Sequence, residues 1–144
     1  MAKSLQLVVS LLVSLMMGHM AYGQTSINWQ DLADVHFTSH GKKDPVYGLP
    51  NFGPTVEALE GQTVVIDGYM LPLTVDNTLY ILSKYPFTEC FFCGGAGKET
   101  VVELKLSEQL KFNVDEPVTI QGKLKLIEDP LQISYVLEEA TRIE

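Results

Sequence analysis

The chain has 144 residues, of which 46% are hydrophobic and 19% are charged, with 11 Gly, 7 Pro, two Cys and three His. This length suits one small domain, and the apolar fraction is too high for a disordered chain. Ten basic residues against 18 acidic ones give a formal net charge of -8, and no basic run is longer than Lys42-Lys43. This balance excludes a nucleic-acid binder that acts by neutralising phosphates.

Residues 1–23 have the composition of a secretory signal peptide. Lys3 is their only charged residue, Leu5 to Met17 is almost wholly apolar, and Ala21 and Gly23 put small residues where signal peptidase requires them. The alternative, a transmembrane anchor, needs about 20 apolar residues, and this run is shorter. We therefore expect cleavage after Gly23. The mature chain, periplasmic or secreted, is predicted to have no membrane span.

Residues 24–60 are predicted to form an N-terminal segment of short helix and loop. Ser26 to Val35 starts with a candidate Ser cap and is interpreted as a short helix. Residues 41–54 contain three Gly and three Pro residues, which indicates a loop. One helical turn is expected over Thr55 to Glu60, closed by Gly61.

Residues 61–144 are predicted to form five strands. Val118 to Leu126 carries the clearest signal, because apolar and polar residues alternate over nine positions. Gly68 and Pro72 interrupt the first strand as a bulge or an edge does. The turn Asp76-Asn77 indicates a hairpin between the first two strands. The expected strands are residues 63–74, 78–85, 100–106, 118–126 and 131–143.

Such strands cannot leave their edges bare in so small a protein, and closure into a barrel removes the edges. We therefore predict a mainly β fold with a small five-stranded antiparallel barrel. The expected barrel is of the oligonucleotide/oligosaccharide-binding (OB) type, with a small sandwich as the alternative. Gly68 and Gly122 are the positions expected to allow strong curvature. The predicted divisions are a signal peptide over 1–23, the N-terminal segment over 24–60 and the barrel over 61–144.

The densest chemistry in the chain is a Cys-x-x-Cys-Gly motif at Cys90 and Cys93. This form is typical of a metal knuckle, in which one turn points both sulfurs the same way and glycine lets backbone amides face the thiolates. Zinc in a closed site takes four ligands. His36 and His40 have a spacing common in zinc sites and are the candidate completing ligands. The sequence therefore predicts zinc as cofactor in a Cys2His2 site.

Other interpretations of the same motif remain open. Two cysteines in an exported protein can form a structural disulfide, or they can act as a thiol redox pair. The two histidines can be ordinary surface residues. The neighbouring aromatic residues can pack beneath the loop or form an exposed binding patch; they are Tyr85, Phe87, Phe91 and Phe92.

A phosphate-binding loop is rejected for Gly94 to Lys98. Glu99 stands where such a loop needs Ser or Thr, and Phe92 stands where it needs its first Gly. No serine, histidine and acid set stands out either, so we interpret the protein as non-enzymatic.

Two segments, Gly68 to Leu73 (Gly-Tyr-Met-Leu-Pro-Leu) and Cys90 to Gly97, resemble a group of small exported bacterial proteins of unknown function. The likeness covers about residues 59–143. A related branch carries a similar Gly-Tyr-x-Leu-Pro-Leu run and then a Cys with a His two positions later, where this chain has Phe92. Since a Cys and a His can bind a metal but cannot form a disulfide, the resemblance favours a transition metal at Cys90 and Cys93.

These observations combine into one hypothesis. The chain is expected to be an exported β-barrel that binds a transition metal, accessory to an envelope transport system and with an envelope protein as partner. The alternatives are a disulfide-stapled interaction module without metal and a thiol redox protein.

Overall fold

The computed structural model describes residues 23–38, 48–74, 79–108 and 110–143, and within these ranges the fold is mainly β, as predicted. No helix in these ranges has the length and apolar character needed to cross a bilayer. The strands are β1 (Thr25–Ser26), β2 (Val35–Thr38), β3 (Leu49–Phe52), β4 (Thr63–Pro72), β5 (Tyr80–Ser83), β6 (Val101–Leu106), β7 (Glu116–Leu126) and β8 (Tyr135–Arg142). The helical turns are η1 (Asp31–Ala33), α2 (Pro54–Glu57), η3 (Phe87–Glu89), η4 (Phe91–Cys93) and η5 (Lys98–Thr100).

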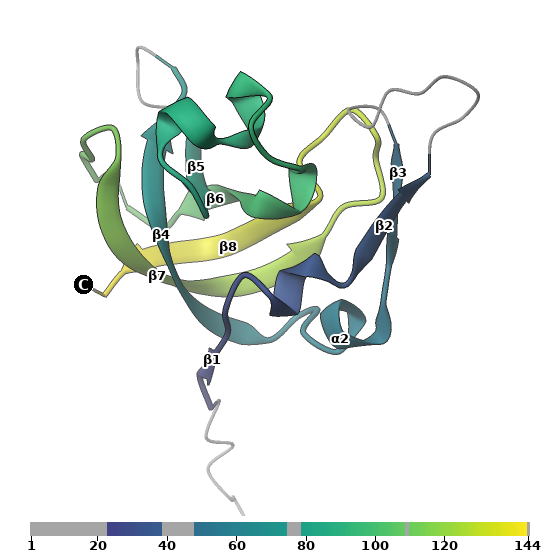
Figure 1. Ribbon diagram of the computed structural model, residues 1–144. Helices are drawn as coiled ribbons and strands as arrows, with labels where there is room; N and C mark the ends of the chain where they lie inside the picture. Colours follow the sequence, from purple (N-terminus) through teal and green to yellow (C-terminus); the bar gives the residue numbers. More distant parts are fainter. Residues whose placement is uncertain (1–22, 39–47, 75–78, 109, 144) are drawn as a thin grey trace, which may run out of the picture.

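Five strands close into a barrel in the order β4-β5-β6-β8-β7, and β7 pairs back onto β4 (Figure 1). The pairs are antiparallel except β6 with β8, which is parallel with Leu104 opposite Leu137. The prediction of a five-stranded barrel is confirmed, but the prediction that it is purely antiparallel is wrong. Strand directions cannot alternate all the way around a ring with an odd number of members. One parallel pair is therefore unavoidable.

The alternation in the sequence of β7 is confirmed as an inside and an outside face. Ile120 and Leu124 are almost fully buried, whereas Lys123 between them is exposed. The inward residues of all five barrel strands join one hydrophobic cluster. Because apolar area removed from water stabilises by roughly 25 cal/mol per Å², this continuous cluster is the main source of stability.

Near Gly68, strand β4 passes from its pairing with β7 to its pairing with β5. Thr63 to Met70 pairs with β7, and Tyr69 to Pro72 pairs with β5. A Cβ atom at Gly68 would lie 2.8 Å from both Leu82 Cγ and Ser83 O, so a larger residue would push β4 away from β5. The predicted use of glycine for curvature is thus supported here by a close backbone approach.

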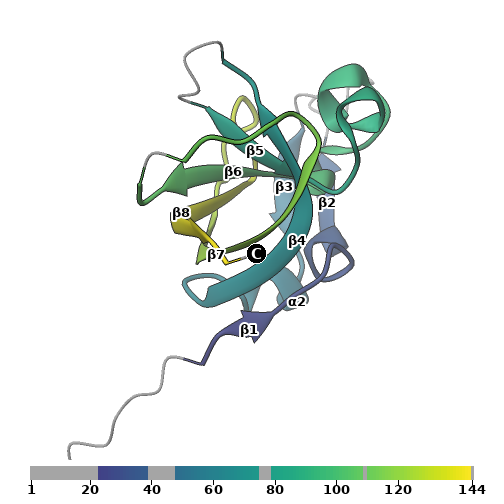
Figure 2. The same ribbon diagram turned by 90° about the vertical axis from the view of Figure 1, so that its left-hand side faces the viewer.

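The N-terminal segment covers one end of the barrel instead of standing apart from it (Figures 1 and 2). Leu32, Phe52 and Val56 belong to the same cluster as the barrel residues. The hydroxyl of Tyr135 in β8 donates to the Leu32 carbonyl at 2.7 Å. Burial raises the pKa of Tyr135, and the nearby negative charges of Glu99 and Asp34 add to the effect.

The predicted helix over Ser26 to Val35 is wrong. The chain there forms β1, which pairs in parallel with β4, then the single turn η1 and the start of β2. Asn28 explains the interruption, because its side-chain oxygen accepts from the backbone N–H of Gln30 at 2.8 Å and its own N–H donates to Asp31. Such local bonds offer the backbone an alternative to a helix.

The loop predicted over residues 41–54 is partly wrong, because Leu49–Phe52 is strand β3, antiparallel to β2. Residues 41–47 of that loop lie outside the described residues. The expected single helical turn is confirmed as α2, and Gly61 beyond it has a φ of +76°. That left-handed conformation suits glycine at the end of a helical turn.

The last strand begins later than predicted. β8 starts at Tyr135, and Leu131 is 79% exposed in the preceding segment. Asp129 stabilises a turn there, since its carboxylate accepts from the N–H of Leu131 at 2.9 Å and from the Gln132 amide at 2.7 Å. Turn formation at an acidic residue therefore outweighs the alternation that suggested an earlier start.

Candidate functional site

The Cys-x-x-Cys motif lies in the long connection between β5 and β6, which we call the cysteine loop (residues 84–100). The loop lies near the top of the view in Figure 1, with α2 near the bottom. It winds through the three short turns η3, η4 and η5. Its first turn is anchored to the β6–β7 connection, because the N–H of Phe87 donates to Asp115 Oδ1 at 2.7 Å.

A tight turn brings the two cysteines together. Cys90 is extended, η4 follows, and the N–H groups of Cys93 and Gly95 both donate to the Cys90 carbonyl at 3.2 Å. Gly94 closes the turn with a φ of +76°. The turn therefore places Cys90 and Cys93 near each other within one loop. The chain thus forms a turn from Cys90 to Cys93 that is followed by glycine, whereas a metal knuckle at this turn stays a prediction.

The two thiols differ in their surroundings. Cys90 is fully buried in a small second cluster with Leu71, Ile81 and Val101, whereas Cys93 is exposed. Desolvation, and then the neighbouring Cys90, raise the pKa of the Cys93 thiol. Both sulfurs are described as free thiols.

The second cluster covers the outer face of β4, β5 and β6. OB barrels commonly bind oligonucleotides and oligosaccharides on the outer face of their second and third strands, which correspond to β5 and β6 here. In this protein Cys90 and the partly buried Phe91 from the cysteine loop pack on that face, together with Ile133 from the β7–β8 connection. The cysteine loop therefore takes the place that a ligand occupies in other barrels of this type.

Gly95 allows the loop to close on itself. A Cβ atom at this position would lie 2.6 Å from the backbone oxygen of Glu89. That distance is far below van der Waals contact, and the atom it would meet is backbone, which cannot rotate away. The glycines after the motif thus serve close packing of the loop as well as the turn itself.

Lys98 is a residue of this site that the sequence reasoning missed, because we considered it only as part of a rejected phosphate loop. It is 6% exposed, and its Nζ donates to the Pro130 carbonyl at 3.0 Å. Desolvation lowers its pKa, while the charge of Asp129 opposes that shift. The ammonium also lies 5.7 Å from the centre of the Phe37 ring. Lys98 therefore ties the cysteine loop to the β7–β8 connection and to β2.

The structure does not bring His36 to the cysteines. His36 lies on β2, opposite Asn51 of β3, with its side chain exposed. Across residues 23–38, 48–74, 79–108 and 110–143, no three His, Cys, Asp or Glu side chains are grouped to hold a metal. His40 lies outside the described residues. The predicted Cys2His2 set is therefore not assembled among the described residues, and a role for His40 stays a prediction.

Some aromatic residues of the cysteine loop pack beneath it, and others are exposed. Phe91 packs against the second cluster, as core packing predicts. Phe87 and Phe92 are 43% and 42% exposed, so core packing is the wrong interpretation for them. The ring of Phe92 rests edge-on against Phe91, with centroids 5.3 Å apart. The cysteine loop thus exposes two phenylalanines in addition to Cys93.

No protein-family model and no curated protein matches this chain. Among solved structures, a DUF3299 family protein from Pseudomonas aeruginosa PAO1 is similar, with a TM-score of 0.55 and 19% sequence identity over 85% of this chain and 97% of that chain. At this identity the likeness establishes the fold alone. This chain is therefore a small mainly β protein whose five-stranded mixed barrel has a counterpart in a DUF3299 family protein.

Proposed function

We propose that this chain is an exported protein without catalytic activity that binds a transition metal, foremost zinc, through Cys90 and Cys93. The observation that carries the proposal is the turn that keeps both cysteines in one short loop and ends in a left-handed glycine. Thiolates are strong ligands for zinc, and this turn keeps two of them in one short loop. Cys93 is exposed, and the buried Cys90 becomes accessible when the loop opens.

Two further ligands are needed beyond the two cysteine sulfurs. Zinc takes four ligands in a closed site, and the described residues supply the two sulfurs. We propose His40 as a third ligand and a group from a second envelope protein as the fourth. The exposure of Cys93, and of Phe87 and Phe92 in the same loop, supports an approach by that partner.

The test is a zinc titration of the fully reduced mature chain at neutral pH against a chromophoric zinc indicator. We expect one zinc per chain. Cys90→Ser and Cys93→Ser should each abolish binding, because one thiolate alone cannot hold the ion. His40→Ala should weaken it, whereas His36→Ala is the matched control and should leave it unchanged. Absence of zinc binding by the fully reduced wild-type chain would remove the proposal.

A disulfide is the second candidate, and the tight turn that joins the two cysteines is the observation that favours it. Oxidation would join Cys90 Sγ to Cys93 Sγ, with both thiol hydrogens removed by an oxidising partner such as a periplasmic disulfide. Protein purified from its native compartment would then be lighter than its reduced form by two hydrogen atoms and would hold no metal. The stabilisation should be modest because the closed loop is short.

Export is part of the proposal and has its own test. The apolar run and the small residues before Gln24 support cleavage by signal peptidase. The intact mass of the protein from the periplasmic fraction should correspond to a chain that begins at Gln24. A mass that includes residues 1–23 would contradict export by cleavage.

A further inference from the structure

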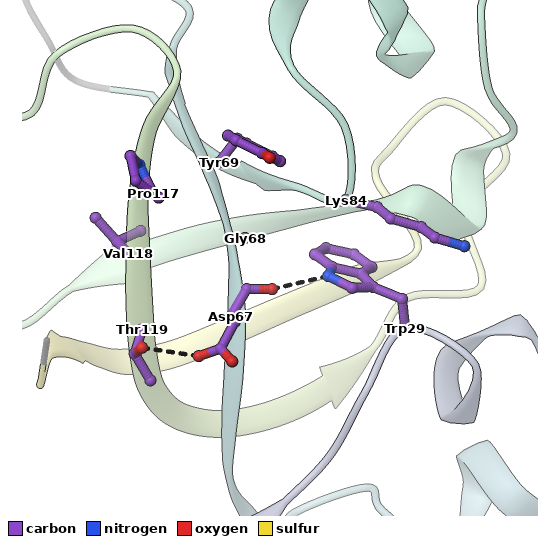
Figure 3. A pocket seen from close by; sticks show the side chains of 8 residues that line it. All are labelled: Trp29, Asp67, Gly68, Tyr69, Lys84, Pro117, Val118 and Thr119. Atoms are coloured by element: carbon purple, nitrogen blue, oxygen red, sulfur yellow. Dashed lines mark hydrogen bonds between the residues drawn. The ribbon is translucent and has the colours of Figure 1, made fainter.

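A pocket of about 420 Å³ lies on the outer face of the barrel where β4 and β7 pair, and no residue of the Cys-x-x-Cys turn lines it. Figure 3 shows the pocket from close by. Its size is within the range of small-molecule sites. The side chains that give it its chemistry are Trp29, Asp67, Tyr69, Lys84, Pro117 and Thr119.

The paired strands β4 and β7 form the floor of the pocket. Asp67 stands opposite Thr119, and Tyr69 stands opposite Pro117. Val118, between the two β7 residues, faces the core. Successive side chains of a strand point to opposite faces, so the two cross-strand pairs share the outer face.

Two hydrogen bonds hold the pocket in shape. The indole N–H of Trp29 donates to the backbone carbonyl of Asp67 at 2.8 Å, which fixes the ring beside β4 (Figure 3). The Thr119 hydroxyl donates to Asp67 Oδ1 at 2.7 Å, which orients the carboxylate. Trp29 and Asp67 therefore do not need to be ordered by a ligand, and pre-organisation of this kind favours binding.

The lining offers charges of both signs beside two aromatic rings. Within the described part of the chain neither Asp67 nor Lys84 forms an ion pair, so an acceptor and a donor remain for a ligand. The Lys84 Nζ atom also lies 5.2 Å from the centre of the Tyr85 ring, which is not part of the pocket lining. Trp29 and Tyr69 are both half-buried, so part of each ring faces solvent.

We propose that this pocket binds a neutral sugar, as one or two pyranose rings of an oligosaccharide. Sugar hydroxyls both donate and accept, so they satisfy the Asp67 carboxylate and the Lys84 ammonium together. The C–H faces of a pyranose ring pack well on the rings of Trp29 and Tyr69. An anionic ligand would meet the Asp67 carboxylate and the net charge of -8, whereas a cationic ligand would meet Lys84.

This inference does not rest on the metal proposal, because the pocket and the cysteines are built from different residues. It also differs in place from the usual ligand face of OB barrels, which the cysteine loop covers. The pocket uses the seam of β4 and β7 instead.

Trp29 makes the test specific, because it is the only tryptophan in the chain. The full mature protein is titrated with maltotriose, cellotriose and triacetylchitotriose while tryptophan fluorescence is recorded. We expect at least one of them to give a saturable change, with a Kd on the order of 1 mM or tighter. Trigalacturonate, an anionic trisaccharide, should give none.

Variants assign the binding to the pocket. Tyr69→Ala and Lys84→Met should each weaken binding about tenfold or more, while thermal melts check that the barrel stays folded. Lys123→Ala, on the exposed face of β7 outside the pocket, is the matched control and should bind as the wild type does. The proposal is overturned if none of the three neutral trisaccharides binds, if only trigalacturonate binds, or if the folded pocket variants bind as tightly as the wild type.

Discussion

The barrel and the cysteine loop differ in the contacts that stabilise them. The barrel closes through continuous strand pairing and one large cluster, to which the N-terminal segment contributes Leu32, Phe52 and Val56. The cysteine loop rests on a cluster with four buried members, of which Cys90 is the loop's own. Stability is therefore distributed over many contacts in the barrel and concentrated in few contacts in the loop.

This difference separates the two parts in their response to mutation. Segments with few buried contacts open locally at a lower free energy than the core does. The thiols of Cys90 and Cys93 should therefore change their accessibility without unfolding of the barrel. A loop of this kind can adapt to a metal or a partner while the scaffold stays rigid.

The largest expected effect is on the barrel core. Leu124→Ala should lower the free energy of unfolding by about 2–5 kcal/mol, because it removes a fully buried side chain and leaves a cavity. Lys123→Ala, one position away on the exposed face, should change it by less than about 0.5 kcal/mol. Denaturant melts measure both. Equal effects at the two positions would contradict the inside and outside assignment of β7.

Tyr135→Phe should lower the free energy of unfolding by about 1–3 kcal/mol, because the buried Leu32 carbonyl loses its donor. Tyr80→Phe is the matched comparison. Its hydroxyl donates to the Leu110 carbonyl at 2.8 Å in a less buried place, so its loss should cost less. Denaturant melts at neutral pH measure both variants, and an equal or larger loss in Tyr80→Phe would contradict the tight link between β8 and the N-terminal segment.

The same tyrosine predicts a pH dependence. Burial raises the pKa of Tyr135 above its ordinary value of about 10. The unfolded chain then ionises at lower pH than the folded one, so the stability from the neutral phenol is fully present below about pH 10 and is lost as the pH rises further. Melts of the wild type should decline more steeply above pH 10 than melts of Tyr135→Phe. Parallel curves would contradict the raised pKa.

A smaller and more local effect is expected from Gly95→Ala. The added methyl group would meet the Glu89 carbonyl oxygen, and such overpacking costs about 1–3 kcal/mol, or ~5- to 150-fold in the opening of the loop. The rate at which Cys90 reacts with a thiol reagent should rise by that factor, while the melting of the barrel stays near the wild-type value. Phe92→Ala, at an exposed ring, is the control. A loss of barrel stability as large as that of Leu124→Ala would show that the two regions are not separable.

The mildest test changes no residue. In the reduced wild-type protein an alkylating reagent should label the exposed Cys93 first and the buried Cys90 at least about tenfold more slowly, because Cys90 reacts only when the loop opens. Mass spectrometry of peptides gives the two rates. Equal rates would mean that the second cluster does not protect Cys90.

The predictions from sequence succeeded where a pattern is repeated over many positions. The alternation from Val118 to Leu126 correctly assigned which residues of β7 face the core. The predictions failed where the hydrogen bonds of one or two side chains determine the backbone conformation. Asn28 and Asp129 form local hydrogen bonds that interrupt a helix in one case and delay a strand in the other.

The sequence by itself determined the fold class, the inward faces of the strands and the turn that joins Cys90 to Cys93, since these depend on residues close together in the chain. Only the tertiary structure decided the parallel pairing of β6 with β8, the burial of Cys90 against Leu71 and Ile81, and the position of His36 away from the cysteines. It also brought Trp29 to Asp67 to form the pocket at the β4–β7 seam. Barrel closure decides these contacts between residues far apart in the chain, and no local pattern carries that information.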